Sequence, residues 1–304
     1  MVSLPSLRRL AGRLGAVVLV TIVAAALAPA PPSAAAPVRP SPTRAYQDLP
    51  ALHHTGCVVS QSSRAFKACR FGDRNGRHTV VLVGDSKAAQ WFTPLERIAK
   101  AQKWRLVVIA KNGCSFARVT RMRDGRPDRK CEDWSKRALR TIKQLRPDVV
   151  VPVTRWGDGL PRGARSGQQT EAAMVRGLVA YWRQVLRTGA RVSPILDTPG
   201  PPSGDAPACV RKNRDDLSRC AFPKAPAMRS SGASAAREAA RTLRGVKAID
   251  MSRHMCPRST CPAVLRGILV YRGGSHISDT YATSRTRALS RALHSSTRGR
   301  LGRR

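Results

Sequence analysis

The sequence alternates between short apolar runs and longer amphipathic segments, and this alternation limits the fold more than any other feature. The apolar runs cover residues 79–83, 105–110, 148–153, 191–196 and 246–249. Four of these runs are rich in Val, Leu and Ile, which is typical of strands buried on both faces of a parallel sheet. The amphipathic segments have helical spacing and cover residues 88–102, 132–145, 169–187, 234–243 and 278–293. The alternation predicts a three-layer α/β/α fold with a mostly parallel, five-stranded sheet and right-handed crossovers.

The composition agrees with one large globular domain flanked by other segments. Of the 304 residues, 42% are hydrophobic, which is enough to build a core and excludes a wholly disordered basic chain. No apolar run approaches the ~20 residues of a membrane helix, so a multi-pass membrane protein is also excluded. We expect the folded domain to span residues 57–294, with a loop insertion at 198–226 and a basic tail at 295–304.

The first 36 residues have the pattern of a targeting segment: a basic start, an apolar run, and small residues that suit a signal peptidase. These features occupy Arg8, Arg9 and Arg13, then residues 14–28, then residues 33–36. The apolar run is short for a membrane span, which favours a cleaved signal peptide. Pro37 disfavours cleavage directly before it and keeps an uncleaved signal anchor open. Either alternative places the protein outside the cytoplasm, and residues 37–56, with four prolines, are expected to form a flexible stalk.

Export changes the interpretation of the eight cysteines, because exported proteins form disulfides. Eight cysteines allow 105 connectivities, and the simplest hypothesis pairs neighbours in the sequence so that each bond closes one loop. The neighbour pairs are Cys57–Cys69, Cys114–Cys131, Cys209–Cys220 and Cys256–Cys261. A zinc site that uses His254, Cys256 and Cys261 is the alternative, but no C-x-x-C occurs. We therefore expect disulfides, no metal and no cofactor.

The chain is strongly basic, with 55 Lys and Arg against 18 Asp and Glu and a formal net charge of +37. Such a surface attracts acidic partners, among them anionic polymers of the cell envelope. The alternative is a basic composition whose charges are merely solvated. Nucleic acid is disfavoured as a partner, because the sequence has an export signal, only 5% aromatic residues and no zinc-finger or RNP-like motif.

A candidate nucleophile stands where the first predicted strand meets the first predicted helix, in the segment Gly84-Asp85-Ser86. In an open α/β sheet, ligands bind outside the carboxyl ends of the strands. The free N–H groups and the dipole at a helix start would stabilise an oxyanion beside Ser86. The alternative is that these residues only cap the helix, which is common at such junctions.

A candidate base lies near the other end of the chain. His276 ends a glycine-rich loop, residues 271–276, directly before the last predicted helix. This position brings an imidazole to the same edge of the sheet as Ser86. A serine and a histidine in this arrangement fit a nucleophile and its general base.

These segments resemble the SGNH hydrolase superfamily, in particular the SGNH domain attached to membrane acyltransferases that O-acylate cell-surface polysaccharides. The similarity is carried, in order, by residues 81–91, 111–114, 146–150, 197–199, 256–264 and 271–282. It implies a flavodoxin-like SGNH-hydrolase fold. It further implies that Ser86 accepts the acyl group, that His276 is the base, and that the backbone N–H groups of Ser86 and Gly113 form the oxyanion hole.

The sequence departs from the family pattern at two positions. Lys87 follows the nucleophile where the group usually has His, and Gly273 stands three residues before His276 where the family has Asp. That Asp normally fixes the tautomer of the base and stabilises the imidazolium. Either a backbone carbonyl or another carboxylate orients His276, with Asp250 and Asp279 as the candidate carboxylates, or the enzyme is slow or inactive.

The family's third-block Asn also has no clear counterpart, and Arg155 and Trp156 occupy its neighbourhood. We take these two residues, together with Asp85 and Lys87, as candidate substrate-binding residues.

Two functions follow from these features. The first is an exported acyl-ester enzyme that hydrolyses or transfers O-acyl groups, with acetyl expected, on cell-surface glycans; transfer would need a separate membrane protein as acyl donor. The second is a catalytically decayed SGNH-fold module that binds anionic cell-wall polymer through its basic surface.

Overall fold

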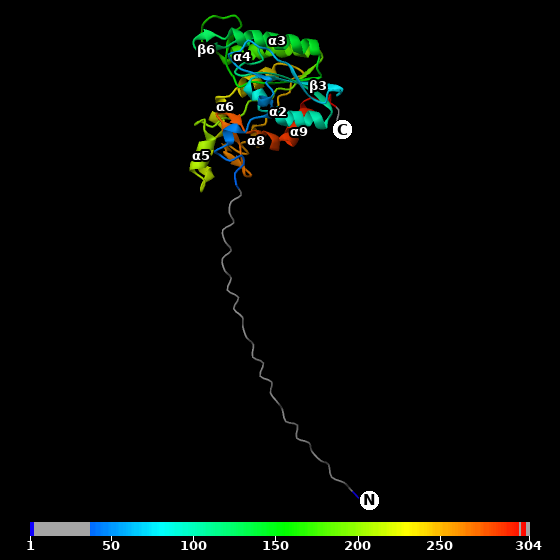
Figure 1. Cartoon of the computed structure of the whole chain (residues 1–304), viewed down its shortest axis with the longest axis vertical. Helices are drawn as coiled ribbons and strands as arrows, with labels where there is room; N and C mark the ends of the chain where they lie inside the picture. Colours follow the sequence, from blue (N-terminus) through cyan, green and yellow to red (C-terminus); the bar gives the residue numbers. More distant parts are fainter. Residues whose placement is uncertain (3–36, 298, 302–304) are drawn as a thin grey trace. The chain divides into compact units, whose positions relative to one another are not determined.

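The computed structural model describes residues 1–2, 37–297 and 299–301 (Figure 1). Almost all of the expected signal or anchor segment therefore lies outside the described residues. The described residues from 37 onward belong to one compact unit. Within the described ranges, no helix is both long and apolar enough to cross a membrane.

Four of the predicted apolar runs supply strands of the central sheet. Its other two strands, at residues 58–59 and 69–72, were not predicted, so the sheet has six strands and not the expected five. Its parallel strands lie in the order β1 (Val58–Val59), β4 (Trp104–Lys111), β3 (His78–Gly84), β8 (Val149–Val153) and β10 (Arg191–Val192). A further strand, β2 (Cys69–Gly72), pairs with β4 in the antiparallel direction. The sheet confirms the predicted α/β class and its mostly parallel pairing.

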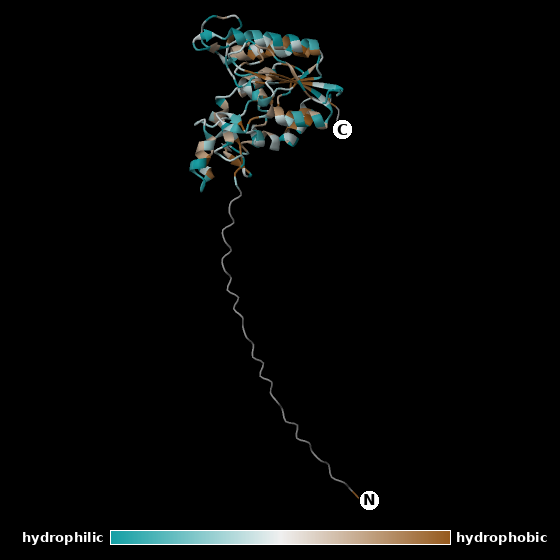
Figure 2. Cartoon of the chain, in the orientation of Figure 1, coloured by the Kyte–Doolittle hydropathy of each residue, from teal (hydrophilic) through white to brown (hydrophobic). Residues whose placement is uncertain are grey.

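The sheet is buried on both faces, as its apolar strands require. Alternate residues point to opposite faces, so Val80 and Leu82 contribute to one core cluster and Val81 and Val83 to the other. The first cluster packs against α2 and α9, and the second against α3, α4 and α7. Figure 1 shows α3 and α4 on one side of the strands and α2 and α9 on the other, and Figure 2 shows the apolar strands between these helices. The three-layer prediction is therefore confirmed.

The helices follow the predicted amphipathic segments with small shifts at their ends, and the first and last predicted helices are each divided in two. These helices are α1 (Ser86–Ala89), α2 (Phe92–Ala101), α3 (Arg129–Leu145), α4 (Glu171–Leu186), α7 (Ala233–Arg241), α8 (Asp279–Ser284) and α9 (Thr286–Ser296). Polar residues cap several of them: Asp128 accepts the N–H of Cys131 in α3, and Thr170 accepts the N–H of Ala173 in α4.

The loop insertion expected at 198–226 contains regular elements of its own. They are α5 (Ala206–Lys212), the 3-10 helix η3 (Leu217–Cys220), β11 (Phe222–Pro223) and the start of α6 (Lys224–Arg229). Asp205 caps the start of α5 by accepting the N–H of Ala208. This helix start was missed when the segment was expected to be an irregular loop. The predicted strand at 246–249 differs in the opposite direction, because it forms only isolated bridges, Val192 with Val246 and Ile195 with Ile249.

Short pairs of antiparallel strands and 3-10 helices complete the fold around the sheet. The paired strands are β5 (Val119–Thr120) with β9 (Leu160–Pro161), β6 (Met122–Arg123) with β7 (Arg126–Pro127), β11 with β12 (Thr260–Cys261), β13 (Val264–Leu265) with β14 (Ile268–Leu269), and β15 (Tyr271–Gly273) with β16 (His276–Ile277). The remaining 3-10 helices are η1 (Ala45–Gln47), η2 (Ala51–His54) and η4 (Ser252–His254).

Residues 37–56 pack onto the domain, which corrects the expectation of a flexible stalk. Ala45 and Leu52 are fully buried in the core. The backbone of Arg39 exchanges hydrogen bonds with the segment around β14, and the carboxylate of Asp48 accepts the N–H of Thr280 at 3.0 Å. This segment is therefore ordered against the domain, and we call residues 37–56 the strap. At the other end of the chain, the described part of the basic tail also contacts the domain, because Leu301 is buried.

All eight cysteines are paired as neighbours. The disulfides are Cys57–Cys69, Cys114–Cys131, Cys209–Cys220 and Cys256–Cys261, with sequence separations of 12, 17, 11 and 5 residues. This confirms the simplest pairing hypothesis. The last bond also takes both sulfurs of the alternative zinc site, so they are not available as thiolate ligands there.

We predict that Gly84→Ala strongly destabilises the fold, because Gly84 has φ +150° and a Cβ there would lie 1.9 Å from the carbonyl oxygen of Val153. The matched control is Gly189→Ala, where φ is +87° and nothing lies within 4 Å, so only backbone strain is added. Urea denaturation should show that Gly84→Ala loses about 2 kcal/mol more unfolding free energy than the control. Equal losses would contradict the close approach of β3 and β8.

Candidate active site

The structure brings Ser86 and His276 together at the carboxyl edge of the sheet. Ser86 is the first residue of α1, directly after β3, and His276 opens β16. The Oγ of Ser86 lies 2.8 Å from the Nε2 of His276, which is hydrogen-bonding distance. Both side chains are partly exposed, so the pair can be reached from solvent. This geometry suits proton transfer from the hydroxyl to the imidazole.

The imidazole of His276 is oriented by the backbone instead of a carboxylate. It forms a hydrogen bond with the backbone of Gly273, and this bond favours the protonated ring, so the ring donates to the carbonyl. The pairing of β15 with β16 sets Gly273 opposite His276. The glycine therefore occupies the family's Asp position in the sequence and supplies an acceptor through its main chain.

The two candidate carboxylates do not reach His276. Asp250 pairs with Arg237 at 2.8 Å and accepts the N–H of Ser252. Asp279 begins α8, and its side chain interacts with Thr93. Burial raises the pKa of Asp279. Neither Asp250 nor Asp279 is among the groups that shift the pKa of His276.

Burial and nearby cations lower the pKa of His276 to about 3. The largest cause is loss of hydration on burial, followed by the charges of Lys87, Arg272 and Arg155. At neutral pH the imidazole is therefore uncharged and its Nε2 can accept a proton. The same cations would oppose the imidazolium that forms once the proton has been accepted.

The side chain of Lys87 is fully buried. Lys87 therefore cannot contact a substrate directly, which corrects its assignment as a candidate substrate-binding residue. Its Nζ lies 3.0 Å from a carboxylate oxygen of Asp197 and 3.0 Å from the Oγ1 of Thr198. It also donates to the carbonyl of Ser275 at 2.5 Å. Burial lowers the pKa of Lys87, and the charge of Asp197 opposes this. Lys87 thereby joins the nucleophile turn to the loop that carries His276.

Asp85 is buried as well and acts within the fold. One carboxylate oxygen accepts the N–H of Lys87 at 2.9 Å, which caps α1, and the other accepts the N–H of Arg155 at 2.8 Å. Burial raises the pKa of Asp85 to about 6. These bonds hold the end of β3 to the segment after β8, and they leave no exposed carboxylate for a substrate.

Gly113 lies in the turn after β4, with φ +70°, and Ser86 begins a helix, so both positions leave backbone N–H groups without strand partners. Within the described part of the chain, neither N–H has a hydrogen-bond partner. The indole of Trp156 donates to the carbonyl of Gly113 at 3.0 Å and fixes this turn. A Cβ at residue 113 would lie 2.7 Å from the side chain of Gln61, so the turn is closely covered there.

Arg155 and Trp156 are half-buried at the end of β8. The guanidinium of Arg155 donates to the Oγ of Ser275 at 3.1 Å, one residue before the base. The guanidinium of Arg121 lies 3.9 Å from the centre of the Trp156 ring, and that of Arg155 lies 5.2 Å from it. These are the two expected binding residues that remain partly accessible.

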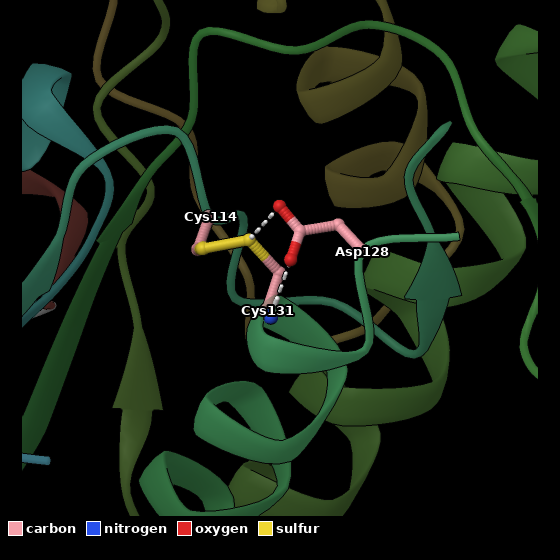
Figure 3. A group of neighbouring side chains, drawn as sticks. All are labelled: Cys114, Asp128 and Cys131. Atoms are coloured by element: carbon pink, nitrogen blue, oxygen red, sulfur yellow. Dashed lines mark hydrogen bonds between the residues drawn. A yellow bond between two sulfur atoms is a disulfide. The ribbon is translucent and has the colours of Figure 1, made fainter. Parts of the chain in front are cut away.

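A second cluster lies beside the Gly113 turn and has the residue types of a metal site. Figure 3 shows Cys114, Asp128 and Cys131, whose potential ligand atoms lie within 4.8 Å of one another. The two sulfurs are bonded to each other, so no thiolate is present and the set does not fit a metal. Asp128 instead accepts the N–H of Cys131 at 3.2 Å and caps α3. The disulfide ties the residue after Gly113 to the start of that helix.

Several residues of the site were not found from the sequence. Ser275 takes part through its carbonyl and its hydroxyl, and Thr198 and Thr154 contribute hydroxyl groups to buried contacts. A backbone carbonyl has no residue signature, and threonines are common near strand ends. The adjacency of Ser275 to His276 was the available signal.

Comparison with known proteins identifies relatives of the whole folded region. A family model described as the SGNH domain fused to AT3 domains matches residues 56–289. Among solved structures, the periplasmic domain of the lipopolysaccharide acetyltransferase of Salmonella ser. Paratyphi A is similar, with a TM-score of 0.54 and 14% identity. The match covers 80% of this chain and 88% of that one. No curated protein sequence matches significantly.

We predict that Lys87→Met destabilises the protein by about 3–5 kcal/mol, because it leaves the carboxylate of Asp197 buried without its cation. The double variant Lys87→Met/Asp197→Asn should regain part of this loss. Urea denaturation measures both, with Lys143→Met as control, since Lys143 is exposed and its loss should cost little. A single variant as stable as the control would show that the ion pair does not hold the site.

A titration followed by NMR should show that the ring of His276 stays neutral well below the ordinary histidine pKa of about 6.5. Burial and the neighbouring cations disfavour the charged ring, so its resonances should not change from pH 8 to about pH 4 and should shift only near its pKa of about 3. Comparison with His276→Ala assigns the signal. A midpoint near pH 6.5 would contradict the described environment.

Proposed function

The chain belongs to the family of SGNH domains fused to AT3 domains, and from its site geometry we propose that it is a serine-dependent acyl-ester enzyme. Family membership supports an acyl-transfer or esterase-like function. The observation that carries the assignment of residues is the 2.8 Å contact between Ser86 Oγ and His276 Nε2, with the imidazole neutral at physiological pH.

In the proposed reaction, Ser86 Oγ attacks the acyl carbonyl while His276 Nε2 takes its proton. The backbone N–H groups of Ser86 and Gly113 are the proposed donors to the oxyanion that forms. Collapse breaks the ester bond, and His276 returns the proton to the leaving hydroxyl. Water or a sugar hydroxyl then attacks the acyl-serine, gives its proton to His276, and releases Ser86 with that proton.

The rate of this reaction should be modest. The imidazolium formed in both steps has a carbonyl as its orienting partner and lies near Lys87, Arg272 and Arg155. Loss of the carboxylate in a serine-protease triad lowers kcat on the order of 10⁴-fold. The lowered pKa keeps the ring uncharged at acidic pH, but it also makes the ring a weaker base.

We propose cell-surface glycans as substrates and the cell envelope as the location. The support is the likeness to the periplasmic domain of a lipopolysaccharide acetyltransferase, together with the targeting pattern of the first 36 residues. Since the family is described by fusion to AT3 domains, we propose that a membrane protein supplies the acyl group when the reaction is transfer.

A second candidate function is supported by a basic cavity of about 420 Å³ at the β6–β7 hairpin and the start of α3. Its cationic lining residues are Arg64, Arg123, Arg126, Arg129 and Lys130. Two acidic residues, Asp124 and Asp128, also line it, so positive charge predominates. This surface suits a carboxylate- or phosphate-bearing polymer of the envelope.

The test is p-nitrophenyl acetate hydrolysis by the disulfide-bonded protein beside Ser86→Ala and His276→Ala. We expect each substitution to reduce turnover at least about 10³-fold, because each removes a member of the proton-transfer pair. Arg183→Ala, at an exposed position on α4, is the control and should retain full activity.

Turnover that persists in Ser86→Ala would overturn the proposal. Absence of Ser86-dependent turnover would instead favour the second candidate function, the binding of an anionic polymer. That function requires salt-sensitive sedimentation with an anionic polymer, lost in the double variant Arg64→Glu/Arg126→Glu.

A further inference from the structure

A cavity of about 490 Å³ lies at the amino end of the central strands, beside the last residue of α3. Its rim carries three exposed arginines, Arg70, Arg74 and Arg105. Its floor is apolar and includes Val107 of β4 and Leu145, with which α3 ends. The volume lies within the range of small-ligand pockets. The cavity is thus large enough for one small ligand.

This part of the sheet is uncovered because α3 ends before the strands do. The helix stops where Arg146 adopts a left-handed conformation, with φ 45°, directly before Pro147. Val107 is packed in the same core cluster as the inner face of α3 and is only 5% exposed. Arg105 points to the same face of β4, two residues earlier, and is exposed. The helix therefore covers Val107 and leaves Arg105 open.

The strand register brings two of the arginines over the same floor. Arg70 on β2 lies opposite Val107, and Arg105 is two residues from Val107 on β4. Such diagonal neighbours on one face of an antiparallel pair are about 7–8 Å apart, which long side chains can span. Arg74 comes from the turn after β2, and Thr79 of β3 lies beside Arg105. One ligand can therefore contact guanidinium groups from two strands and a turn.

Positive charge dominates the cavity. Among the described residues, no carboxylate lines it. The carboxylate of Asp73 accepts the N–H of Asn75, and that of Asp148 accepts the N–H of Thr79 at 2.8 Å and lies 3.5 Å from His78. The end of α3 adds only about half an elementary negative charge, which three guanidinium groups outweigh. An anion bound between the arginines would reduce their mutual repulsion.

The lining suits a ligand that is both charged and apolar. Guanidinium groups bind carboxylates and phosphates through paired, charge-assisted hydrogen bonds. The side chains of Val107 and Leu145 would remove an adjoining apolar group from water. An inorganic ion would use the rim alone, and a neutral apolar molecule the floor alone. A carboxylate or phosphate joined to a short apolar chain uses both.

We propose that this cavity is a binding site for a small amphiphilic anion, a carboxylate or phosphate joined to an apolar chain. The site is separate from the proposed catalytic pair, because Thr79 lies at the start of β3 and Ser86 follows its end. β3 has 7 residues, so the two sites lie about 20 Å apart along the strand. The inference therefore does not depend on the proposed function.

The first experiment compares ligands by isothermal titration calorimetry on the full-length protein. The probes are octanoate and octyl phosphate, below the concentrations at which they form micelles. Inorganic phosphate lacks the chain, and octyl glucoside lacks the charge. Both octyl anions should bind at least about tenfold more tightly than either comparison, because only they use rim and floor together. Inorganic phosphate that binds as tightly as octyl phosphate would overturn the proposal.

The second experiment uses variants that separate the cavity from the general positive charge of the chain. Arg105→Gln should weaken octyl phosphate about tenfold, the effect of losing a hydrogen bond between charged groups. Arg183→Gln, at an exposed position on α4, removes the same charge elsewhere and should leave the affinity unchanged. Leu145→Gln should reduce the advantage of octyl phosphate over inorganic phosphate. Equal weakening by Arg105→Gln and Arg183→Gln would contradict a built site.

Two further measurements identify the source of the ligand and its independence from the catalytic pair. Sedimentation with phosphatidylglycerol vesicles, but not with phosphatidylcholine vesicles, that is weakened more by Arg105→Gln than by Arg183→Gln would identify a lipid headgroup. Cavity-dependent binding of the soluble anions alone would identify a free amphiphile. Ser86→Ala should bind the probes as the native protein does, whether or not the native protein hydrolyses esters. Loss of binding in Ser86→Ala would place the ligand at the other edge of the sheet and overturn the proposal.

Discussion

The site depends on one buried ammonium group. Lys87 is fully enclosed, and its Nζ contacts Asp197, Thr198 and the carbonyl of Ser275, so one cation joins three segments that are far apart in the sequence. A charge is costly to bury unless its hydrogen bonds are satisfied, and only one arrangement of these segments satisfies them. The helix that starts with Ser86, the proposed nucleophile, and the loop that ends with His276, the proposed base, are thereby held in register. The pair Asp85 and Arg155 adds a second, similar link across the top of β8.

The same cation contributes to the lowered pKa of His276, for which burial is the largest cause. Catalytic histidines are usually supported by a carboxylate, which favours the charged ring. In this site the bond to a carbonyl favours the charged ring, but burial and the cationic neighbours favour the neutral form more strongly. The arrangement keeps the resting ring uncharged, but it makes that ring a weaker base and the imidazolium a stronger acid. The favourable position of the ring and its electrostatics therefore act in opposite directions. The bond from Trp156 to Gly113 and the disulfide at Cys114 stiffen the remaining wall of the site.

The sequence was sufficient for the features that depend on residue type and spacing. The apolar runs predicted four of the six strands of the sheet, and the local cysteine pairs predicted the disulfides. The Ser86 and His276 segments predicted residues that lie 2.8 Å apart. What could not be predicted depends on three-dimensional packing. Lys87 was a candidate substrate-binding residue, but its side chain is fully buried, which is rare for lysine. The role of Gly273 lies in a carbonyl that every residue has. The strap at 37–56 was misjudged because prolines are equally compatible with ordered and mobile chain.

The space around Gly273 is limited by the segment 37–56. A Cβ at this position would lie 3.1 Å from the ring of Tyr46, whose hydroxyl is bonded to Asp205, so any side chain at 273 requires Tyr46 to shift. Residue 46 lies on the strap, more than two hundred positions away in the chain. A side chain introduced at residue 273 is therefore coupled to the position of the strap, because the ring of Tyr46 must move to make room for it. The effects of an Asp at residue 273 and of a smaller side chain at residue 46 are therefore not expected to be additive.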